Sequence, residues 1–331
     1  MDSDKSANND GEQYDPVVQF LDMNVPDGLC RREKTLQLVK CQSFKEANKS
    51  FSALIGDILR VADTGLTIPK RLMVEFYYGR ATCRLELDLL IEVLEDVHEA
   101  LRWEKPARLL YLPPQISLVR DATITRLLEQ LPNWILRIPD LIKKLHTYGD
   151  DSLEQEEFVH ALLCYRDVLT LSGVVRECQI MNKQTTARLL LGYSECCLEI
   201  AKTDKDVPNQ TFTKLCGDHC IKALDLIESE QEEDECRALC AKAYDLKSRA
   251  FHNQGDIKKA IEMAEEAHSI LPSEARESEI RRLKRTQDEI EAVETRESLK
   301  YDPDWIAGLV TASSGRVAKT SKWWMLGYDS Q

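Results

Sequence analysis

The sequence is poor in glycine and has no long apolar run. Its 331 residues include 13 Gly and 11 Pro, and no stretch approaches the ~20 consecutive apolar residues of a membrane-spanning helix. The first fifteen residues are polar and do not resemble a signal peptide. Apolar residues recur at three- and four-residue intervals, and no alternating run is long enough for a sheet. We therefore expect an all-α protein of the cytoplasm or the nucleus, with no membrane insertion.

The motifs of common enzyme classes are also missing. The sequence contains no glycine-rich phosphate loop, no GxSxG or HExxH motif and no kinase signature. Its six histidines stand mostly on expected helices, where a lone histidine is ordinarily a surface or packing residue. They are His98, His146, His160, His219, His252 and His268. We expect a protein that is not an enzyme and takes no cofactor, with a triad assembled only in space as the minor alternative.

An excess of positive charge is absent, because 57 acidic residues outnumber 44 Lys and Arg and give a formal net charge of −13. Binding to a phosphate backbone depends on clustered Lys and Arg, so we expect no nucleic-acid partner and keep an RNA-binding helical repeat as a minor alternative. The short basic run from Arg281 to Arg285 fits a solvated helix face better than an import signal.

Eleven cysteines without a secretory context indicate reduced thiols and no disulfide framework. Cys216, His219 and Cys220, with Cys236 and Cys240, are the residues nearest to a zinc site in spacing. No tight CxxC pair is present, and cysteine packs well as a small apolar residue where helices cross. We therefore expect these cysteines to pack in the core and expect no metal site.

One stretch near the carboxyl end matches a known repeat at eight positions. They are Tyr244, Ser248, Phe251, Gly255, Asp256, Ala260, Ala267 and Pro272. In this spacing the stretch resembles the tetratricopeptide repeat (TPR) family. The resemblance implies two antiparallel helices with a turn at Gly255 and Asp256, where Gly takes a positive φ and Asp caps the next helix. One such pair cannot bury its apolar face alone, so we expect further copies beside it.

Weaker copies precede this unit and cover most of residues 29–272. Residues 80–87 and 94–101 follow the repeat's rhythm but depart at Asp88-Leu89-Leu90, where the glycine-centred turn is missing. The other partial matches are Phe44, Ala47 and Phe51; Phe158, Ala161 and Tyr165 after a helix from Trp134 to His146; and Gly192 with Cys216, Cys220 and Ala223 across a polar loop at 204–210. The resemblance implies a right-handed α-α superhelix with irregular repeats.

The chain divides into three expected parts. Residues 1–13 are predicted to be disordered, residues 14–297 to form the TPR-like domain, and residues 298–331 to form an aromatic tail. The domain begins with a short helix over 14–21 and ends with a capping helix that starts at Ser273. Four apolar residues of that helix form one stripe: Ile280, Leu283, Ile290 and Val293. In the tail, Trp323 and Trp324 are predicted to dock on a partner or on the chain's own groove.

The resemblance also implies a function, which is that of a non-enzymatic adaptor holding a protein or peptide partner in a concave groove. The positions that face the groove in the family are Lys242, Asp245, Arg249, His252 and Asn253 in the best unit, and Tyr78, Thr82 and Leu85 in the second.

A co-chaperone that grips the acidic carboxyl-terminal tail of a heat-shock chaperone is the alternative. Such proteins use a clamp of Lys, Asn and Arg side chains for two carboxylates. Arg32 stands at the first Lys position, but Leu36 and Gly79 occupy the Asn positions, so the clamp is predicted to be broken.

Overall fold

The structure, a computed structural model, describes residues 15–106, 113–174, 181–203, 209–227 and 234–300. In these ranges the chain forms fourteen helices and no strand, which confirms the all-α expectation. The helices are α1 Pro16–Asn24, α2 Gly28–Lys40, α3 Phe44–Ala62, α4 Lys70–Glu86, α5 Leu90–Glu104, α6 Pro114–Glu129, α7 Leu131–Trp134, α8 Ile138–Glu154, α9 Phe158–Val174, α10 Lys183–Thr203, α11 Asn209–Ile227, α12 Asp234–Gln254, α13 Ile257–Ile270 and α14 Glu274–Lys300. None of the helices in the described ranges combines the length and apolarity needed to cross a membrane.

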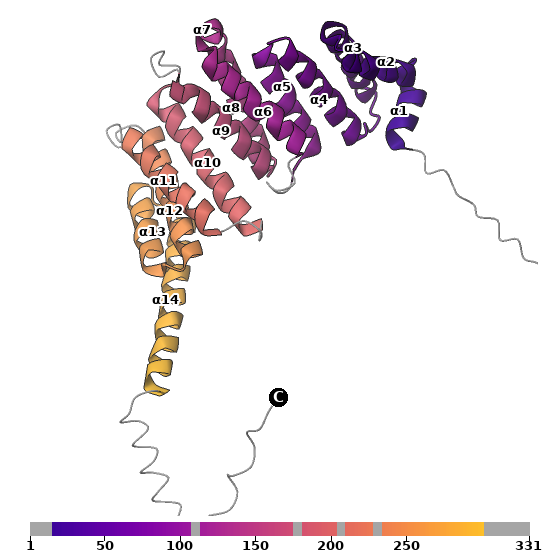
Figure 1. Ribbon diagram of the computed structural model, residues 1–331. Helices are drawn as coiled ribbons and strands as arrows, with labels where there is room; N and C mark the ends of the chain where they lie inside the picture. The colour runs from indigo at the N-terminus through magenta and orange to yellow at the C-terminus, as the bar shows by residue number, and fades with distance from the viewer. Residues whose placement is uncertain (1–14, 107–112, 175–180, 204–208, 228–233, 301–331) are drawn as a thin grey trace, which may run out of the picture.

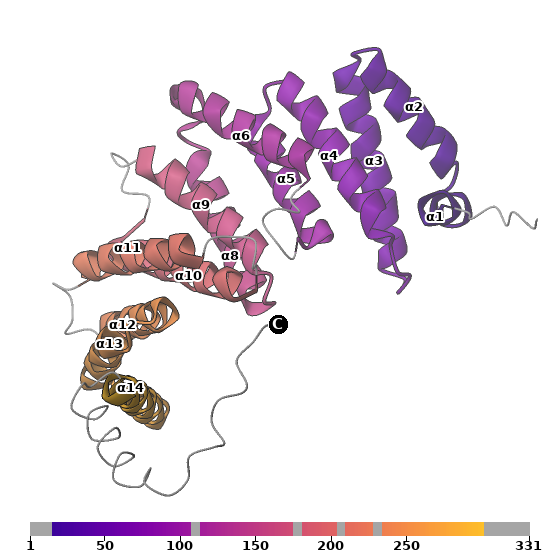
Figure 2. The same ribbon diagram turned by 60° about the horizontal axis from the view of Figure 1, so that its bottom comes forward.

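Helices that follow one another in the sequence pack in pairs. The closest pairs are α4 with α5, α8 with α9, α10 with α11 and α12 with α13, and α2 also packs on α3. Each second helix then contacts the first helix of the next pair, as α3 does with α4 and α9 with α10. The pairs stand side by side in chain order from α1 to α13 along an arch (Figures 1 and 2).

Four of the pairs share one turn geometry. A residue one or two positions after the first helix adopts a left-handed φ, and the next amide donates to the carbonyl five residues earlier, which is the Schellman motif. The left-handed residues are Gln42, Asp88, Glu156 and Gly255, with φ of 59°, 54°, 60° and 82°. The corresponding hydrogen bonds run from Ser43 to Leu38, from Leu89 to Arg84, from Glu157 to Ser152 and from Asp256 to Phe251, at 2.8 to 3.0 Å. The departure expected at Asp88 is therefore one of residue type only, because Asp88 makes the same turn as Gly255.

Aromatic rings on second helices pack against glycines of neighbouring first helices. A Cβ atom on Gly79 of α4 would lie 2.5 Å from Cζ of Phe51 in α3. Tyr165 of α9 occupies the same kind of place, since a Cβ on Gly149 of α8 or on Gly192 of α10 would lie 2.6 or 2.9 Å from its ring. The proposed equivalence of Phe51 and Tyr165 is thus confirmed by their packing, and the glycines are what lets these helices approach.

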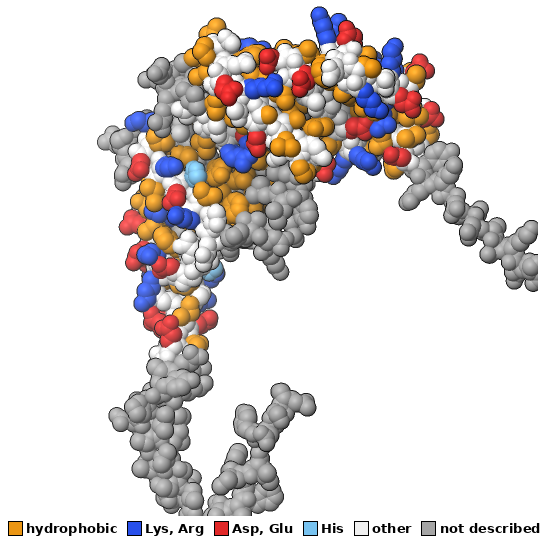
Figure 3. Space-filling model, in the orientation of Figure 1, with side chains coloured by type: hydrophobic (Ala, Val, Ile, Leu, Met, Phe, Trp, Pro, Cys, Tyr) orange, Lys and Arg blue, Asp and Glu red, His pale blue; other side chains and the backbone are white. Residues whose placement is uncertain are grey.

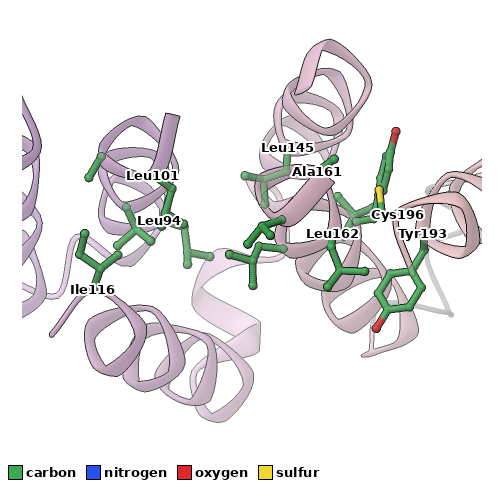
Figure 4. Packing of buried hydrophobic residues seen from close by; sticks show 14 of the residues in the cluster. Leu94, Leu101, Ile116, Leu145, Ala161, Leu162, Tyr193 and Cys196 are labelled. Atoms are coloured by element: carbon green, nitrogen blue, oxygen red, sulfur yellow. The ribbon is translucent and has the colours of Figure 1, made fainter. Parts of the chain in front are cut away.

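One core extends from α1 to α12, and a smaller separate cluster lies between α13 and α14. Buried side chains run from Leu94 in α5 through Leu145 in α8 and Leu162 in α9 to Cys196 in α10 (Figure 4). The cysteines discussed as a zinc alternative are buried members of the same core: Cys216, Cys220, Cys236 and Cys240. Their expected packing role is confirmed.

The best-matched repeat has the predicted local structure. Gly255 and Asp256 separate α12 from α13, and the Asp256 carboxylate accepts a hydrogen bond from the backbone amide of Lys259 at 3.2 Å. Ala260 is fully buried, and Ser248 Oγ of α12 donates to its carbonyl at 2.7 Å. The small residues therefore hold the two helices together as expected.

The capping helix differs from its prediction in one respect. Ser273 Oγ accepts a hydrogen bond from the amide of Arg276, which confirms the cap, and Leu283 is buried against α13. Ile290 and Val293 are 42% and 52% exposed, because α14 extends past α13 (Figure 1). The apolar stripe is therefore covered only in its first half.

Other boundaries shift slightly. The helix expected from Trp134 to His146 is α8, which begins at Ile138 because Pro139 suits a first helical turn. The leading helix spans Pro16–Asn24 and ends before the expected turn at Pro26-Asp27-Gly28. The predicted disordered segment 1–13, most of the loop at 204–210, and the tail with Trp323 and Trp324 lie outside the described residues.

Candidate functional site

Helix α12 carries five of the eight residues predicted to face a groove. Lys242 Nζ lies 2.9 Å from a carboxylate oxygen of Glu195, and Arg249 pairs with Glu199, so these side chains reach across to α10. Asp245 instead faces α14.

The Arg276 guanidinium of α14 donates hydrogen bonds of 2.8 to 3.1 Å to both carboxylate oxygens of Asp245. The first helices of the last two pairs and the capping helix are thus linked by ion pairs along one side. Acidic and basic side chains are interspersed over this end of the molecule, with no field of a single sign on the face in view (Figure 3).

A pocket of about 230 Å³ opens between α12, α13 and α14. Its apolar wall is formed by Ala264 and Ala275, and charged groups surround it. The residues that complete it are Asp245, Ser248, Arg249, Arg276 and Glu279. The structure therefore brings two of the predicted residues, Asp245 and Arg249, to one small cavity.

Charges converge at the rim of this pocket. The pKa of Glu279 is held below its ordinary value by a hydrogen bond from Arg282, with the charges of His252 and Arg249 adding to the effect. His252 and Asn253 are half-buried at the end of α12. The pocket thus sets an ionised carboxylate and a guanidinium beside two alanines.

The three predicted positions on α4 do not join this pocket. Tyr78 is half-buried against the main core, and the Thr82 hydroxyl donates to the Tyr78 carbonyl within its own helix at 3.0 Å. Leu85 is 9% exposed and belongs to the core, which corrects the expectation that it faces a groove. Helix α4 also lies far along the arch from α12 (Figure 1).

The positions compared with a carboxylate clamp are engaged within the chain. Arg32 makes two hydrogen bonds to Glu75 of α4, at 2.8 and 2.9 Å. Leu36 packs on the main core, and Gly79 lies against the ring of Phe51. Glu75 therefore takes the guanidinium that a ligand carboxylate would need.

A second candidate site lies in the middle of the arch, where α5, α6, α8 and α9 meet. Six polar or ionisable side chains are buried there within contact of one another: His98, Arg120, Ser152, His160, Cys164 and Asp167. The Nδ1 or Nε2 atoms of the two histidines and the sulfur of Cys164 all lie within 4.8 Å of each other. These three residues are the group in the described chain that could hold a metal ion.

The hydrogen bonds of this cluster fix how its rings are oriented. Asp167 accepts from Arg120, with Nε at 2.8 Å, and from Nε2 of His98 at 3.0 Å. A carboxylate only accepts, so the proton of His98 resides on Nε2 and its Nδ1 is left as an acceptor. Nδ1 of His160 is 2.8 Å from Ser152 Oγ. The remaining ring nitrogens, His98 Nδ1 and His160 Nε2, face each other at 3.4 Å.

Burial determines the charge of the cluster. Loss of solvation lowers the pKa of His98 well below its ordinary value and that of His160 to about 4, so both rings are neutral at pH 7. Burial likewise raises the pKa of the Cys164 thiol. Arg120 and Asp167 are the charged groups, and each compensates the other.

No model of a known protein family matches this chain, and no curated protein matches it significantly. Both candidate sites therefore rest on the geometry described above.

The buried cluster is not evident from the sequence when each histidine is considered singly. A signal was present: His160, Cys164 and Asp167 recur at intervals of four and three residues, which places them on one face of α9. Their partner His98 stands 62 residues away from His160 in the chain. Only the packing of α5 on α9 unites them.

Proposed function

We propose that this protein is a non-enzymatic adaptor of the tetratricopeptide type, in which helix pairs stack as a right-handed superhelix and bind a segment of a protein partner. The observation that carries the proposal is the recurrence of one unit. The same Schellman turn joins four helix pairs, at Gln42, Asp88, Glu156 and Gly255. Repeated helix pairs create extended surfaces, and binding is what such surfaces ordinarily do.

We place the partner segment on the side formed by α10, α12 and α14. This side combines a small apolar pocket at Ala264 and Ala275 with the guanidinium groups of Arg249 and Arg276. A short extended peptide would seat a small side chain between the alanines and direct a carboxylate or its backbone carbonyls to Arg249, whose ion pair with Glu199 uses one terminal nitrogen. Ion pairs to Glu199 and Asp245 hold the arginines in place before binding.

The co-chaperone alternative has less support. A chaperone tail needs donors for two carboxylates, whereas Arg32 already gives its Nε and one terminal nitrogen to Glu75, Leu36 carries no donor, and Gly79 has no room for a longer side chain beside Phe51. An RNA-binding repeat is disfavoured by the net charge of −13 and by basic groups that are already paired with acidic ones.

A peptide-display selection against the full chain, followed by fluorescence anisotropy titration of the recovered peptides, tests the proposal. Ala275→Leu fills the pocket from an exposed helix position, so we expect it to weaken binding at least tenfold. Ala292→Leu adds the same side chain to an exposed position farther along α14 and is the matched control. Peptides that bind saturably but respond equally to both changes would refute the pocket, and a failure to recover any would refute the adaptor function.

A further inference from the structure

The buried cluster of the central pairs has the geometry of a metal centre. Nδ1 of His98 lies 3.2 Å from Sγ of Cys164 and 3.4 Å from Nε2 of His160. In a tetrahedral zinc site with bonds of about 2.05 Å to nitrogen and 2.3 Å to sulfur, neighbouring ligand atoms are about 3.3 Å apart for two nitrogens and about 3.6 Å for nitrogen and sulfur. These two distances agree with the expected values to within a few tenths of an ångström, and the third pair, His160 and Cys164, lies within 4.8 Å.

The groups behind the ligands match what a metal site requires. A histidine that binds a metal through one nitrogen holds its other nitrogen on a carboxylate, carbonyl or hydroxyl, which fixes the ring. His98 does this through Asp167, which Arg120 anchors in turn. His160 does it through Ser152. Both rings therefore present their remaining nitrogens to the same point.

From this geometry we propose that His98, His160 and Cys164 bind a Zn²⁺ ion between α5 and α9. Two imidazoles and a thiolate form a borderline-soft donor set that suits zinc better than magnesium or calcium. The thiol of Cys164 releases its proton when the ion binds. The fourth tetrahedral position is left to a small ligand such as hydroxide, which with the thiolate balances the charge of the ion.

The site has a structural role in this proposal. α5 belongs to the pair α4–α5 and α9 to the pair α8–α9. Helices α6 and α7 lie between these two pairs in the chain. An ion bound by both helices ties the two pairs together at the centre of the arch. Because it binds the folded chain only, it raises the stability of the fold as the free zinc concentration rises above the dissociation constant.

A hydrogen-bond network without a metal ion would also account for the short distances between these side chains. In that account Ser152 Oγ donates to His160 Nδ1, and His160 Nε2 donates to His98 Nδ1, so no ion is needed. The two accounts differ in whether the folded protein takes up zinc and in whether Cys164 becomes a thiolate.

The test uses the full chain with Cys30→Ser, Cys41→Ser and Cys178→Ser, so that surface cysteines do not compete. Cys30 and Cys41 are the exposed thiols among the described residues, and Cys178 lies outside them. The protein is stripped with a chelator and titrated with Zn²⁺ by competition with a chelating dye, and with Co²⁺ as a spectroscopic probe. We expect one ion per chain, a thiolate-to-cobalt charge-transfer band, and a rise in the melting temperature with added zinc. A folded chain that takes up no zinc would overturn the proposal without any further variant.

Three substitutions then locate the ion. Cys164→Ser is expected to abolish the charge-transfer band and to weaken zinc binding at least 100-fold. Ser152→Ala keeps all three ligands and is expected to weaken zinc binding about tenfold, the lower end of effects at positions behind a ligand. Cys220→Ser removes a buried cysteine of α11, away from the proposed ligands, and should change neither the charge-transfer band nor the affinity for zinc. A charge-transfer band that survives Cys164→Ser, or disappears in Cys220→Ser, would place the ion elsewhere and contradict the proposal.

Discussion

The helical glycines of the described residues fall into two groups, and an alanine substitution should have opposite effects in them. A Cβ on Gly79 would meet three ring atoms of Phe51 at 2.5, 2.9 and 3.0 Å. That ring cannot swing away freely, because Phe51 is buried and its centroid lies 5.9 Å from that of Phe76. A Cβ on Gly56 of α3 or Gly217 of α11 would meet nothing within 4 Å.

The room around each Cβ position sets the expected change in the free energy of unfolding. Overpacking a closed core costs about 1 to 3 kcal/mol, and replacing a helical glycine with alanine returns about 0.5 to 1 kcal/mol. We therefore expect Gly79→Ala to destabilise the protein by about 1 to 2 kcal/mol, whereas Gly56→Ala and Gly217→Ala stabilise it by about 0.5 to 1 kcal/mol.

Urea unfolding followed by far-ultraviolet circular dichroism gives these differences as shifts of the midpoint at unchanged slope. Phe51→Leu should relieve the clash, so the double variant with Gly79→Ala should be more stable than the sum of the single changes by at least about 0.5 kcal/mol. If Gly79→Ala stabilised the protein as Gly56→Ala does, the close packing of ring on glycine would be refuted.

Three further predictions concern the turns, the capping helix and the co-chaperone alternative. Gly255→Ala places a side chain at φ of 82° and should cost about 1 kcal/mol in urea unfolding, whereas Glu156→Gly relieves a left-handed turn and should gain about 0.5 kcal/mol; equal effects would contradict the shared turn. Leu283→Ala should cost about 2 to 5 kcal/mol and Ile290→Ala less than about 0.5, because only Leu283 is buried, and equal melting temperatures would contradict this. Calorimetry with an acidic chaperone-tail peptide should detect no micromolar binding, and tight binding lost on amidation of the peptide would restore the alternative.

The sequence allowed the architecture to be predicted only where a residue type signals a conformation. Gly255 revealed its turn because glycine adopts a positive φ without steric cost. Gln42 and Glu156 make the same turn without such a signal, and Asp88 carries only a weak one, so the earlier repeats seemed irregular. The local Schellman hydrogen bonds accompany the left-handed conformation in all three.

Gly79 shows how a comparison with a family can mislead when only the missing group is considered. In the comparison with a carboxylate clamp, Gly79 stands where the family has Asn and therefore lacks the amide that would donate to a ligand carboxylate. In the fold it provides the space that Phe51 fills. A glycine required for close packing and a glycine that replaces a ligand-binding residue look the same in the sequence. The packing of Phe51 on Gly79 identifies this one as a packing residue.

The candidate sites were predicted unevenly for a related reason. Asp245 and Arg249 reach one pocket because they stand four residues apart on α12, in the repeat that matched best. Leu85 was assigned to a groove on the register of a weaker copy and lies in the core instead. The cluster of His98 and His160 depends on contact between helices of separate pairs, which no local spacing encodes.

Hydrogen exchange on the full chain, with and without a saturating peptide from the display selection, tests the proposed adaptor surface most directly. We predict added protection in α12 and α14, centred on the segments that contain Arg249 and Ala275, and unchanged exchange in α2 to α5. Protection confined to α2 to α5, or none beyond that produced by a scrambled peptide, would contradict the proposed binding side of the arch.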